Sequence, residues 1–179
     1  MQKVISLAKR RGFIFPGSEI YGGLAGTYDY GPLGALLKEN IKQSWLKKFV
    51  HSRNDMYLVD AAILMNAKVW EATGHVANFA DPLVECSKCK KRFRADQIED
   101  TEKCAECGGK LGESRQFNMM LETKLGATED TANTSYLRPE TAQGMFVNFK
   151  NILDSMSPKV PFGMAQIGKA FRNEITPRD

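Results

Sequence analysis

Apolar residues recur at helical spacing in three stretches of the chain. Residues 3–11 predict a short basic helix, and residues 66–75 predict another with Gly74 as its C-cap. The clearest stripe lies between residues 33 and 50, where Pro32 suits the first helical turn. Its members are Leu33, Leu36, Leu37, Ile41, Trp45 and Phe49. Spacing alone does not decide whether this stripe faces the core or a second copy of the chain.

Denser apolar runs predict buried strands over residues 56–65 and 162–174, although two glycines weaken the second pattern. A short strand is expected at 136–138, after a polar, exposed loop over 124–135. A helix follows from about Glu140. We expect its buried side to carry Phe146, Phe149, Ile152, Leu153 and Met156. Because helices and antiparallel-type strands mix without βαβ regularity, the pattern predicts an α+β fold.

Length and composition are those of an ordinary soluble domain. The 179 residues suffice for one full domain and a small appended module. A net charge of +4 permits an acidic partner, such as a nucleic acid or a nucleotide, without requiring one. No run approaches the ~18 apolar residues of a membrane span, and the N-terminus lacks the apolar core of a signal peptide. We therefore expect a cytoplasmic protein with reduced thiols.

All four cysteines lie in a segment of different composition, residues 84–117. They form two C-x-x-C pairs separated by fourteen residues, namely Cys86 with Cys89 and Cys104 with Cys107. Each pair offers two thiolates from one tight turn, and two pairs complete the tetrahedral four-sulfur site typical of Zn²⁺. Four protein ligands leave no open position, so the site is expected to be structural. Two disulfides or four idle thiols are the alternative, which reduced cytosolic thiols disfavour.

Basic residues line the same segment, and they suit either a nucleic acid or simple solvation. They are Lys88, Lys90, Lys91, Arg92 and Arg94.

Charged residues also gather at the ends of predicted strands, in 137–144 and 171–178. An arginine guanidinium matches a phosphate bidentately. Residues two apart on a strand share a face, so Arg172 and Glu174 are expected to project together, with Asn173 on the opposite side. A cation and an anion on one face suit a zwitterionic or phosphate-bearing ligand, and a surface salt bridge is the alternative. The two histidines are far apart in sequence and support no catalytic dyad.

Several of these segments resemble the class II aminoacyl-tRNA synthetases, whose core is an antiparallel sheet. Phe171 to Glu174 (FRNE) is similar to motif 2 of that class. Five longer segments resemble the dimeric type of glycyl-tRNA synthetase: FPGSEIYGGLAGTYDYGPLG, the helix GPLGALLKENIKQSW, ATGHVANFADPLVEC, FRAD and YLRPETAQGMFVNF. The match runs from about Arg11 to the last residue. FRNE is shared across the class, whereas YLRPETAQG after a GHVANFADPLV block is far more selective.

The resemblance implies an α+β fold containing part of the class II antiparallel sheet with helices, plus an inserted zinc-ribbon-like module. Residues 1–83 would be the N-terminal part of a catalytic domain, including motif 1. Residues 84–117 would be the inserted zinc-binding module, and residues 118–179 a core segment that ends in motif 2. In the family, motif 1 forms the dimer seam, so the stripe over 33–50 is expected to face a second copy of the chain.

The resemblance also assigns roles. Arg94 of FRAD and Glu140 of RPET would contact glycine, whereas Arg172, Asn173 and Glu174 would contact ATP, with Arg172 and Glu174 catalytic. The expected reaction uses ATP, Mg²⁺, glycine and tRNA(Gly). A glycine carboxylate oxygen attacks the α-phosphorus of ATP, and Arg172 neutralises the developing charge. Positioning and electrostatics suffice for this step, so no nucleophilic side chain is needed. Selection of glycine would rest on a pocket too small for a side chain.

Two departures from the family stand out. Gln97 occupies a position after FRAD where the family usually has histidine. The chain also ends within motif 2, so the motif 3 arginine and the anticodon-binding domain lie outside it. We therefore expect the N-terminal piece of a catalytic domain, with little or no activity alone.

Two other functions remain open. A non-catalytic synthetase-like module, such as a DNA polymerase accessory subunit, need not keep the four residues Arg94, Glu140, Arg172 and Glu174. A zinc-ribbon nucleic-acid binder would explain residues 84–117 and no others.

Overall fold

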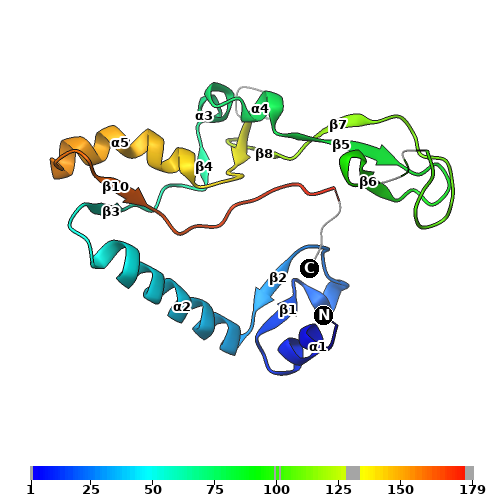
Figure 1. Cartoon of the computed structure of the whole chain (residues 1–179), viewed down its shortest axis with the longest axis horizontal. Helices are drawn as coiled ribbons and strands as arrows, with labels where there is room; N and C mark the ends of the chain where they lie inside the picture. The colour runs from blue at the N-terminus through cyan, green and yellow to red at the C-terminus, as the bar shows by residue number, and fades with distance from the viewer. Residues whose placement is uncertain (1, 99, 101, 128–133, 176–179) are drawn as a thin grey trace. The chain divides into compact units, whose positions relative to one another are not determined.

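The computed structural model describes residues 2–98, 100, 102–127 and 134–175 (Figure 1). The chain divides into two compact units. Within the described ranges, the first unit holds residues 2–59 and 152–167, and the second holds residues 60–151 and 168–175. The described chain mixes helices with mainly antiparallel sheets, which agrees with the predicted α+β class. The predicted module boundaries after residues 83 and 117 stay predictions.

The first unit begins with α1 (Gln2–Arg10), the basic helix that the sequence predicted. A hairpin follows, in which β1 (Ile14–Pro16) pairs antiparallel with β2 (Tyr28–Tyr30) around a 3₁₀ turn at Glu19–Tyr21. The long predicted helix is α2 (Pro32–Leu46), and it continues as a π-helical turn at Lys47–His51. Pro32 occupies the first turn, as expected.

The apolar stripe of α2 lies on the protein surface. Its most exposed members retain 64% (Leu36) and 61% (Ile41) of their accessible area, and Leu33, Leu37 and Phe49 are also exposed. Within the described residues, the stripe is therefore not packed into a hydrophobic core.

No helix in the described part of the chain is long and apolar enough to cross a lipid bilayer.

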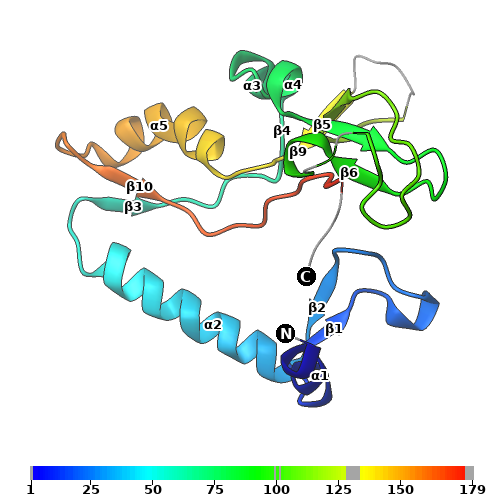
Figure 2. The same cartoon turned by 45° about the vertical axis from the view of Figure 1, so that its right-hand side comes forward.

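Two strands of the first unit run side by side and parallel, β3 (Met56–Leu58) and β10 (Gly163–Ala165), with Met164 opposite Tyr57 (Figure 2). Both are shorter than predicted. The run over 56–65 is divided, because its last two residues form β4 (Leu64–Met65) in a different sheet. The described residues 166–175 are not part of a sheet ladder. Apolar runs specify burial, but they do not specify where a strand changes partner.

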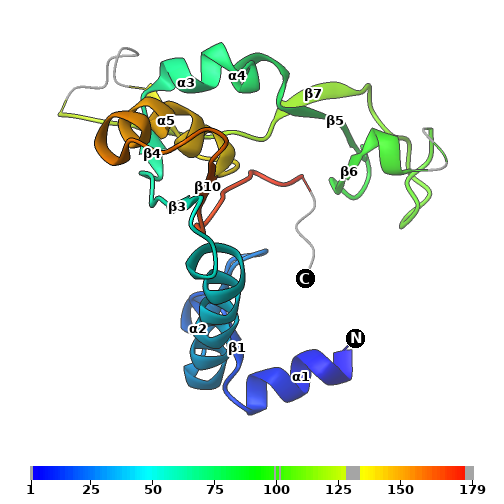
Figure 3. The ribbon, with the colours of Figure 1, turned by 60° about the vertical axis from the view of Figure 1, so that its left-hand side comes forward.

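The second unit contains a three-stranded antiparallel sheet in the order β4–β9–β8, with β8 at Leu121–Lys124 and β9 at Thr134–Leu137. Beside it, α3 (Ala67–Ala72) and α4 (His75–Asn78) follow each other closely (Figure 3). Gly74 separates the two helices with φ +76°, a left-handed conformation that favours glycine. The predicted helix over 66–75 is thus shorter than expected: α3 ends at Ala72 with Thr73 as its C-cap, and Gly74 is the N-cap of α4. Residues 128–133 of the predicted 124–135 loop lie outside the described residues, as do Arg178 and Asp179.

A second antiparallel sheet in this unit has the order β6–β5–β7 and extends toward the cysteine-bearing lobe (Figure 1). Its strands are β5 (Ala80–Glu85), β6 (Arg92–Arg94) and β7 (Arg115–Asn118), with a 3₁₀ turn at Ala95–Gln97. A small core joins the sheet to the lobe and contains Val84, Leu111, Cys86 and Cys104, all buried.

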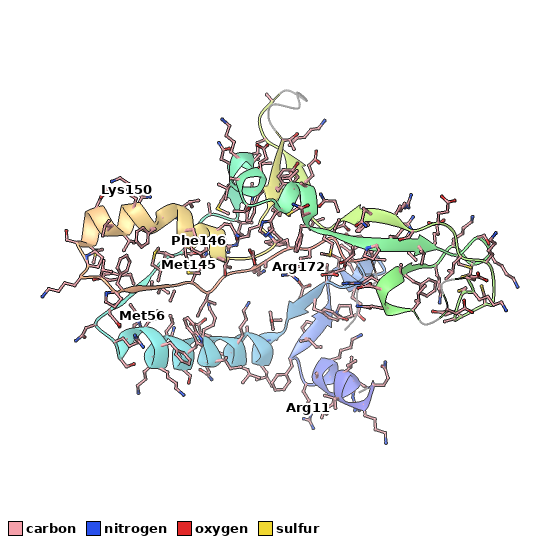
Figure 4. All side chains as sticks on the ribbon, turned by 45° about the horizontal axis from the view of Figure 1, so that its top comes forward. Arg11, Met56, Met145, Phe146, Lys150 and Arg172 are labelled. Atoms are coloured by element: carbon pink, nitrogen blue, oxygen red, sulfur yellow. The ribbon has the colours of Figure 1, made fainter. Side chains whose placement is uncertain are left out.

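Helix α5 (Ala142–Met156) forms where a helix was predicted, but the prediction of its buried side was wrong. Phe146 is 76% exposed and projects from the helix in Figure 4, and Phe149, Leu153 and Met156 are exposed as well. The buried residues of α5 are Gln143 and Gly144 at its N-terminal end. Helical periodicity indicates which residues share a face, but it does not indicate whether the described chain covers that face.

Candidate functional site

The four cysteines converge on one point, as their spacing predicted. Their sulfur atoms all lie within 4.8 Å of one another. The distance from Cys86 Sγ to Cys107 Sγ is 3.5 Å, and from Cys89 Sγ to Cys104 Sγ it is 3.7 Å. Zn–S bonds of ~2.3 Å in a tetrahedron require sulfur–sulfur edges of roughly 3.8 Å. The cluster therefore has the dimensions of a four-thiolate metal site.

The local backbone explains how two distant pairs meet. In each pair the first cysteine accepts a hydrogen bond at its carbonyl oxygen: Lys90 N–H donates to Cys86 at 3.0 Å, and Gly108 N–H donates to Cys104 at 2.9 Å. Gly109 lies against the sulfurs, because a Cβ there would be 3.1 Å from Cys86 Sγ. A bulkier residue would enter the space between the two turns.

The thiols of the cluster differ in acidity. A hydrogen bond from the backbone N–H of Cys89 lowers the pKa of the Cys86 thiol to about 6. At Cys89 the backbone N–H of Lys91 also favours the thiolate, but burial and the neighbouring thiols outweigh it and raise the pKa to about 12. Thiolates this close repel one another, so four can coexist only around a cation. The donor set therefore fits a metal ion.

Part of the basic character of this lobe is neutralised by acidic partners. Lys91 forms an ion pair with Glu106, and Arg92 Nε lies 3.0 Å from Glu85 Oε2. These pairs do not favour the nucleic-acid alternative over simple solvation.

The predicted substrate site lies elsewhere in the same unit, around the segment 168–175. Arg138, only 2% exposed, holds this segment: its Nε donates to Lys169 O and its Nη1 to Ala61 O, both at 2.7 Å. The backbone adds two further bonds at 2.9 Å, from Phe171 N–H to Arg138 O and from Asn173 N–H to Met119 O. The segment before and after Arg172 is thereby fixed.

Arg172 itself is exposed along this segment (Figure 4). Its Nε donates to Pro139 O at 3.2 Å, and its guanidinium carbon lies 5.3 Å from the centre of the Phe79 ring. One edge of the guanidinium is thus anchored next to Glu140, and one face rests on an aromatic ring. A cation held in this way suits a phosphate.

Glu140 follows directly and meets a histidine. His75 Nε2 lies 3.2 Å from Glu140 Oε1, with 41% of the glutamate side chain exposed. The carboxylate is therefore partly held and partly accessible, as an ammonium-binding group must be.

Arg94 is held by two carboxylates. Its Nη1 lies 2.7 Å from Asp81 Oδ2, and its Nε and Nη2 donate to Asp96 at 3.1 and 2.8 Å. The hydrogen bonds that Arg94 donates to Asp96 raise the pKa of Arg94 above its ordinary value, and the charges of Asp81 and Glu174 act in the same direction. Two of the five N–H groups donate to Asp96, and Nη1 is paired with Asp81 by charge.

The structure thus brings the predicted residues into two neighbourhoods of one unit. In the first, Arg172 is hydrogen-bonded to Pro139, the residue before Glu140. In the second, the negative charge of Glu174 helps to raise the pKa of Arg94. Asn173 is fixed through its backbone.

Three residues of this site were missed by sequence reasoning: His75, Phe79 and Asp81. His75 and Phe79 are four residues apart, the spacing that places two side chains on one side of a helical turn. Asp81 lies diagonally from Arg94 on the same face of the sheet, because Leu83 is paired with Arg94. The helical spacing could have been recognised from the sequence, whereas the strand register could not.

Comparison with known proteins shows which proteins this chain is similar to. No family model matches the chain. A glycine–tRNA ligase from Treponema denticola is 55% identical over 183 aligned positions, which cover 100% of this chain and 41% of the relative. Relatives of the same name from Alkaliphilus oremlandii and Bacillus cereus are 54% and 52% identical over 99% of this chain, covering 44% and 45% of their own lengths. The chain spans less than half the length of the curated relatives it matches.

Identity at this level along the whole chain relates the protein to the aminoacyl-tRNA synthetases. Within them, every relative named above is a glycine–tRNA ligase, so the resemblance to glycyl-tRNA synthetase carried by the sequence motifs is confirmed.

Proposed function

We propose that this chain is the N-terminal part of the catalytic domain of a cytoplasmic glycine–tRNA ligase with the class II fold. The complete enzyme would use ATP and Mg²⁺ to form glycyl-adenylate and would then transfer glycine to tRNA(Gly). The observation that carries the proposal is the bond that ties Arg172 to the residue before Glu140. Arg172 Nε donates to Pro139 O at 3.2 Å, and 41% of the Glu140 side chain remains exposed.

The chemistry of each group supports its proposed role. Glu140 is an acceptor for the glycine ammonium group. Arg94, whose guanidinium is held by Asp81 and Asp96, contributes to binding the same amino acid. Arg172 faces the α-phosphate, where negative charge develops as the glycine carboxylate attacks. Asn173 and Glu174 would complete the ATP-binding segment of motif 2.

The test is glycine-dependent exchange between ATP and pyrophosphate, measured on the full-length protein that contains this chain. We expect exchange in the wild type, a loss of at least tenfold in kcat/KM for glycine in Glu140→Gln, and a larger loss in Arg172→Ala. An active wild type whose Glu140→Gln variant keeps its glycine KM would contradict the assignment of Glu140. A folded full-length protein without exchange would instead favour a non-catalytic synthetase-like module.

The 179-residue chain measured alone is expected to show little or no exchange, because in the family a second ATP-binding arginine belongs to motif 3. Robust exchange by this chain would refute that expectation.

We also propose that the four cysteines hold a structural Zn²⁺. The sulfur–sulfur distances of 3.5 and 3.7 Å support it, as does the need for a cation among four thiolates. When bound, the metal would stabilise the fold of residues 84–117, a segment too small to form a sizeable hydrophobic core of its own. Elemental analysis should find one equivalent of zinc per chain, and none in a Cys86→Ser, Cys104→Ser variant.

The exposed stripe of α2 supports a third proposal, that motif 1 forms a homodimer seam. Burying residues such as Leu36 and Ile41 against a second copy would remove apolar surface from water. Sedimentation of the full-length protein should give a dimer, and Leu36→Glu should shift it toward monomer. A wild-type monomer at micromolar concentration would exclude the seam.

A further inference from the structure

His75 lies at the centre of a set of contacts that the proposed catalytic scheme does not use. Its ring centre is 5.4 Å from that of Trp70, which is fully buried, and 5.4 Å from that of Phe79. Its Nδ1 lies 2.8 Å from Thr73 Oγ1, and its Nε2 lies 3.2 Å from Glu140 Oε1. Contacts on both ring nitrogens and with two aromatic rings fix the imidazole in one orientation.

The hydrogen-bond inventory of this ring determines what it offers to Glu140. A carboxylate only accepts, so a neutral ring that carried its proton on Nδ1 would set two acceptors against each other at Nε2. The Thr73 hydroxyl has one proton, which its 2.9 Å bond to Val69 O uses. In the neutral tautomer that avoids the conflict at Nε2, this proton turns to Nδ1 of His75 instead, and Nε2–H donates to Glu140. The imidazolium form also donates from Nε2. In both forms His75 holds the carboxylate by a directed bond.

The bond leaves Glu140 able to bind a ligand. An ionised carboxylate has about four acceptor positions, and 41% of this side chain remains exposed. His75 therefore limits the rotamers of the carboxylate without filling its capacity to bind an ammonium group.

One helical turn further, Phe79 lies beneath Arg172. Its ring centre is 5.3 Å from the guanidinium carbon, and Arg172 Nε donates to Pro139 O at 3.2 Å. These two contacts hold one face and one edge of the guanidinium. The four N–H groups of its two Nη atoms are not used by either contact and can point toward a phosphate.

We propose that α4 together with its C-cap residue Phe79 is a positioning element for both substrate-binding charges: His75 orients Glu140 toward the amino acid, and Phe79 orients Arg172 toward the nucleotide. His75 and Phe79 are four residues apart and lie on one side of the turn, so one short helix sets both groups. This inference rests on the proposed function and adds two positioning residues to it. Neither residue is catalytic, because each acts through another side chain.

The test separates the two Michaelis constants in the exchange assay with the full-length protein. His75→Ala is expected to raise the glycine KM about ten- to hundredfold, the equivalent of one lost hydrogen bond to a charged group, and to leave the ATP KM within twofold. His75→Gln retains an N–H donor near Nε2 and should recover most of the loss. Phe79→Leu should raise the ATP KM about three- to tenfold, with a smaller effect on glycine, whereas Phe79→Tyr keeps the aromatic face.

Ala77→Ser, on the exposed side of α4, serves as the matched control and should change neither constant. A purely structural role would shift both constants together and would not be rescued by glutamine. The inference is overturned if His75→Ala leaves the glycine KM within twofold, if it raises both constants alike, or if His75→Gln is as defective as His75→Ala. A wild-type protein without glycine-dependent exchange would overturn the proposed function, and this inference with it, which is a distinguishable result.

Discussion

Gly109 allows a direct test of the proposed metal site without removing any ligand. A Cβ at this position would lie 2.7 Å from the Lys88 Cβ, 3.1 Å from Cys86 Sγ and 3.3 Å from Cys107 Sγ. Favourable contacts between such atoms begin at roughly 3.5 Å. In Gly109→Ala, each sulfur must therefore move by a few tenths of an ångström, or the two cysteine turns must separate.

A displacement of this size is large for a metal site. Zn–S distances in well-formed sites vary by only about 0.2 Å, and overpacking a well-filled core costs about 1–3 kcal/mol. If that cost falls on the metal-bound state, zinc affinity should drop about five- to 150-fold. The four thiols themselves remain, so the stoichiometry at saturating zinc should stay at one.

The assay is a competition titration against a chromophoric zinc chelator, with thermal unfolding followed in parallel. Gly112→Ala is the matched control in the same lobe, because its Cβ would meet only Glu85 O at an ordinary 3.4 Å. We expect Gly112→Ala to bind zinc like the wild type. If Gly109→Ala binds zinc as tightly as Gly112→Ala, the four sulfurs do not enclose the metal in the arrangement described above.

Three further predictions follow from the charged residues of the second unit. Arg138→Met should lower the free energy of unfolding by about 3–5 kcal/mol in urea titrations, because two carbonyl acceptors lose charged donors, whereas the exposed Arg115→Met should have little effect. Asp81→Asn should raise the glycine KM of the full-length protein severalfold, because Arg94 loses an ion pair at 2.7 Å, and an unchanged KM would argue against that positioning. The hydrogen bonds from Arg94 lower the pKa of Asp96, so its stabilising contribution is present above the ordinary aspartate pKa of about 3.9 and is lost as the pH falls through the lower folded-state value. Thermal unfolding of wild type and Asp96→Asn should therefore differ at pH 6 and converge in strong acid.

The sequence predicted the elements whose signal is local. The α2 helix with Pro32 in its first turn and the meeting of the two cysteine pairs both depend on spacing within a few residues, and both are observed. Gly74 interrupts the helix predicted over 66–75, but as the N-cap of α4 and not as a C-cap. The prediction that Phe146 is buried was wrong. Helical spacing shows that a face is apolar, but the surface that would cover it need not belong to the described chain. The length of the strand predicted over 162–174 was overestimated for a different reason. An extended segment can be held by side-chain hydrogen bonds to its carbonyl oxygens, as Arg138 holds Lys169 O, without belonging to a sheet.

The two arginines of the motif segments show why residue type alone could not assign the site. Both donate to backbone carbonyls, yet Arg138 is 2% exposed and Arg172 lies on the surface. Arg138 donates hydrogen bonds to Ala61 O and Lys169 O, which fixes the path of the backbone just before Arg172. Arg172 donates from its Nε to Pro139 O, and this bond leaves the N–H groups of its Nη atoms able to bind a ligand. If Arg172 binds the phosphate as proposed, the backbone before it must be held in place, and the buried Arg138 holds it. A substitution at Arg138 should therefore impair ATP binding although Arg138 itself does not contact the nucleotide.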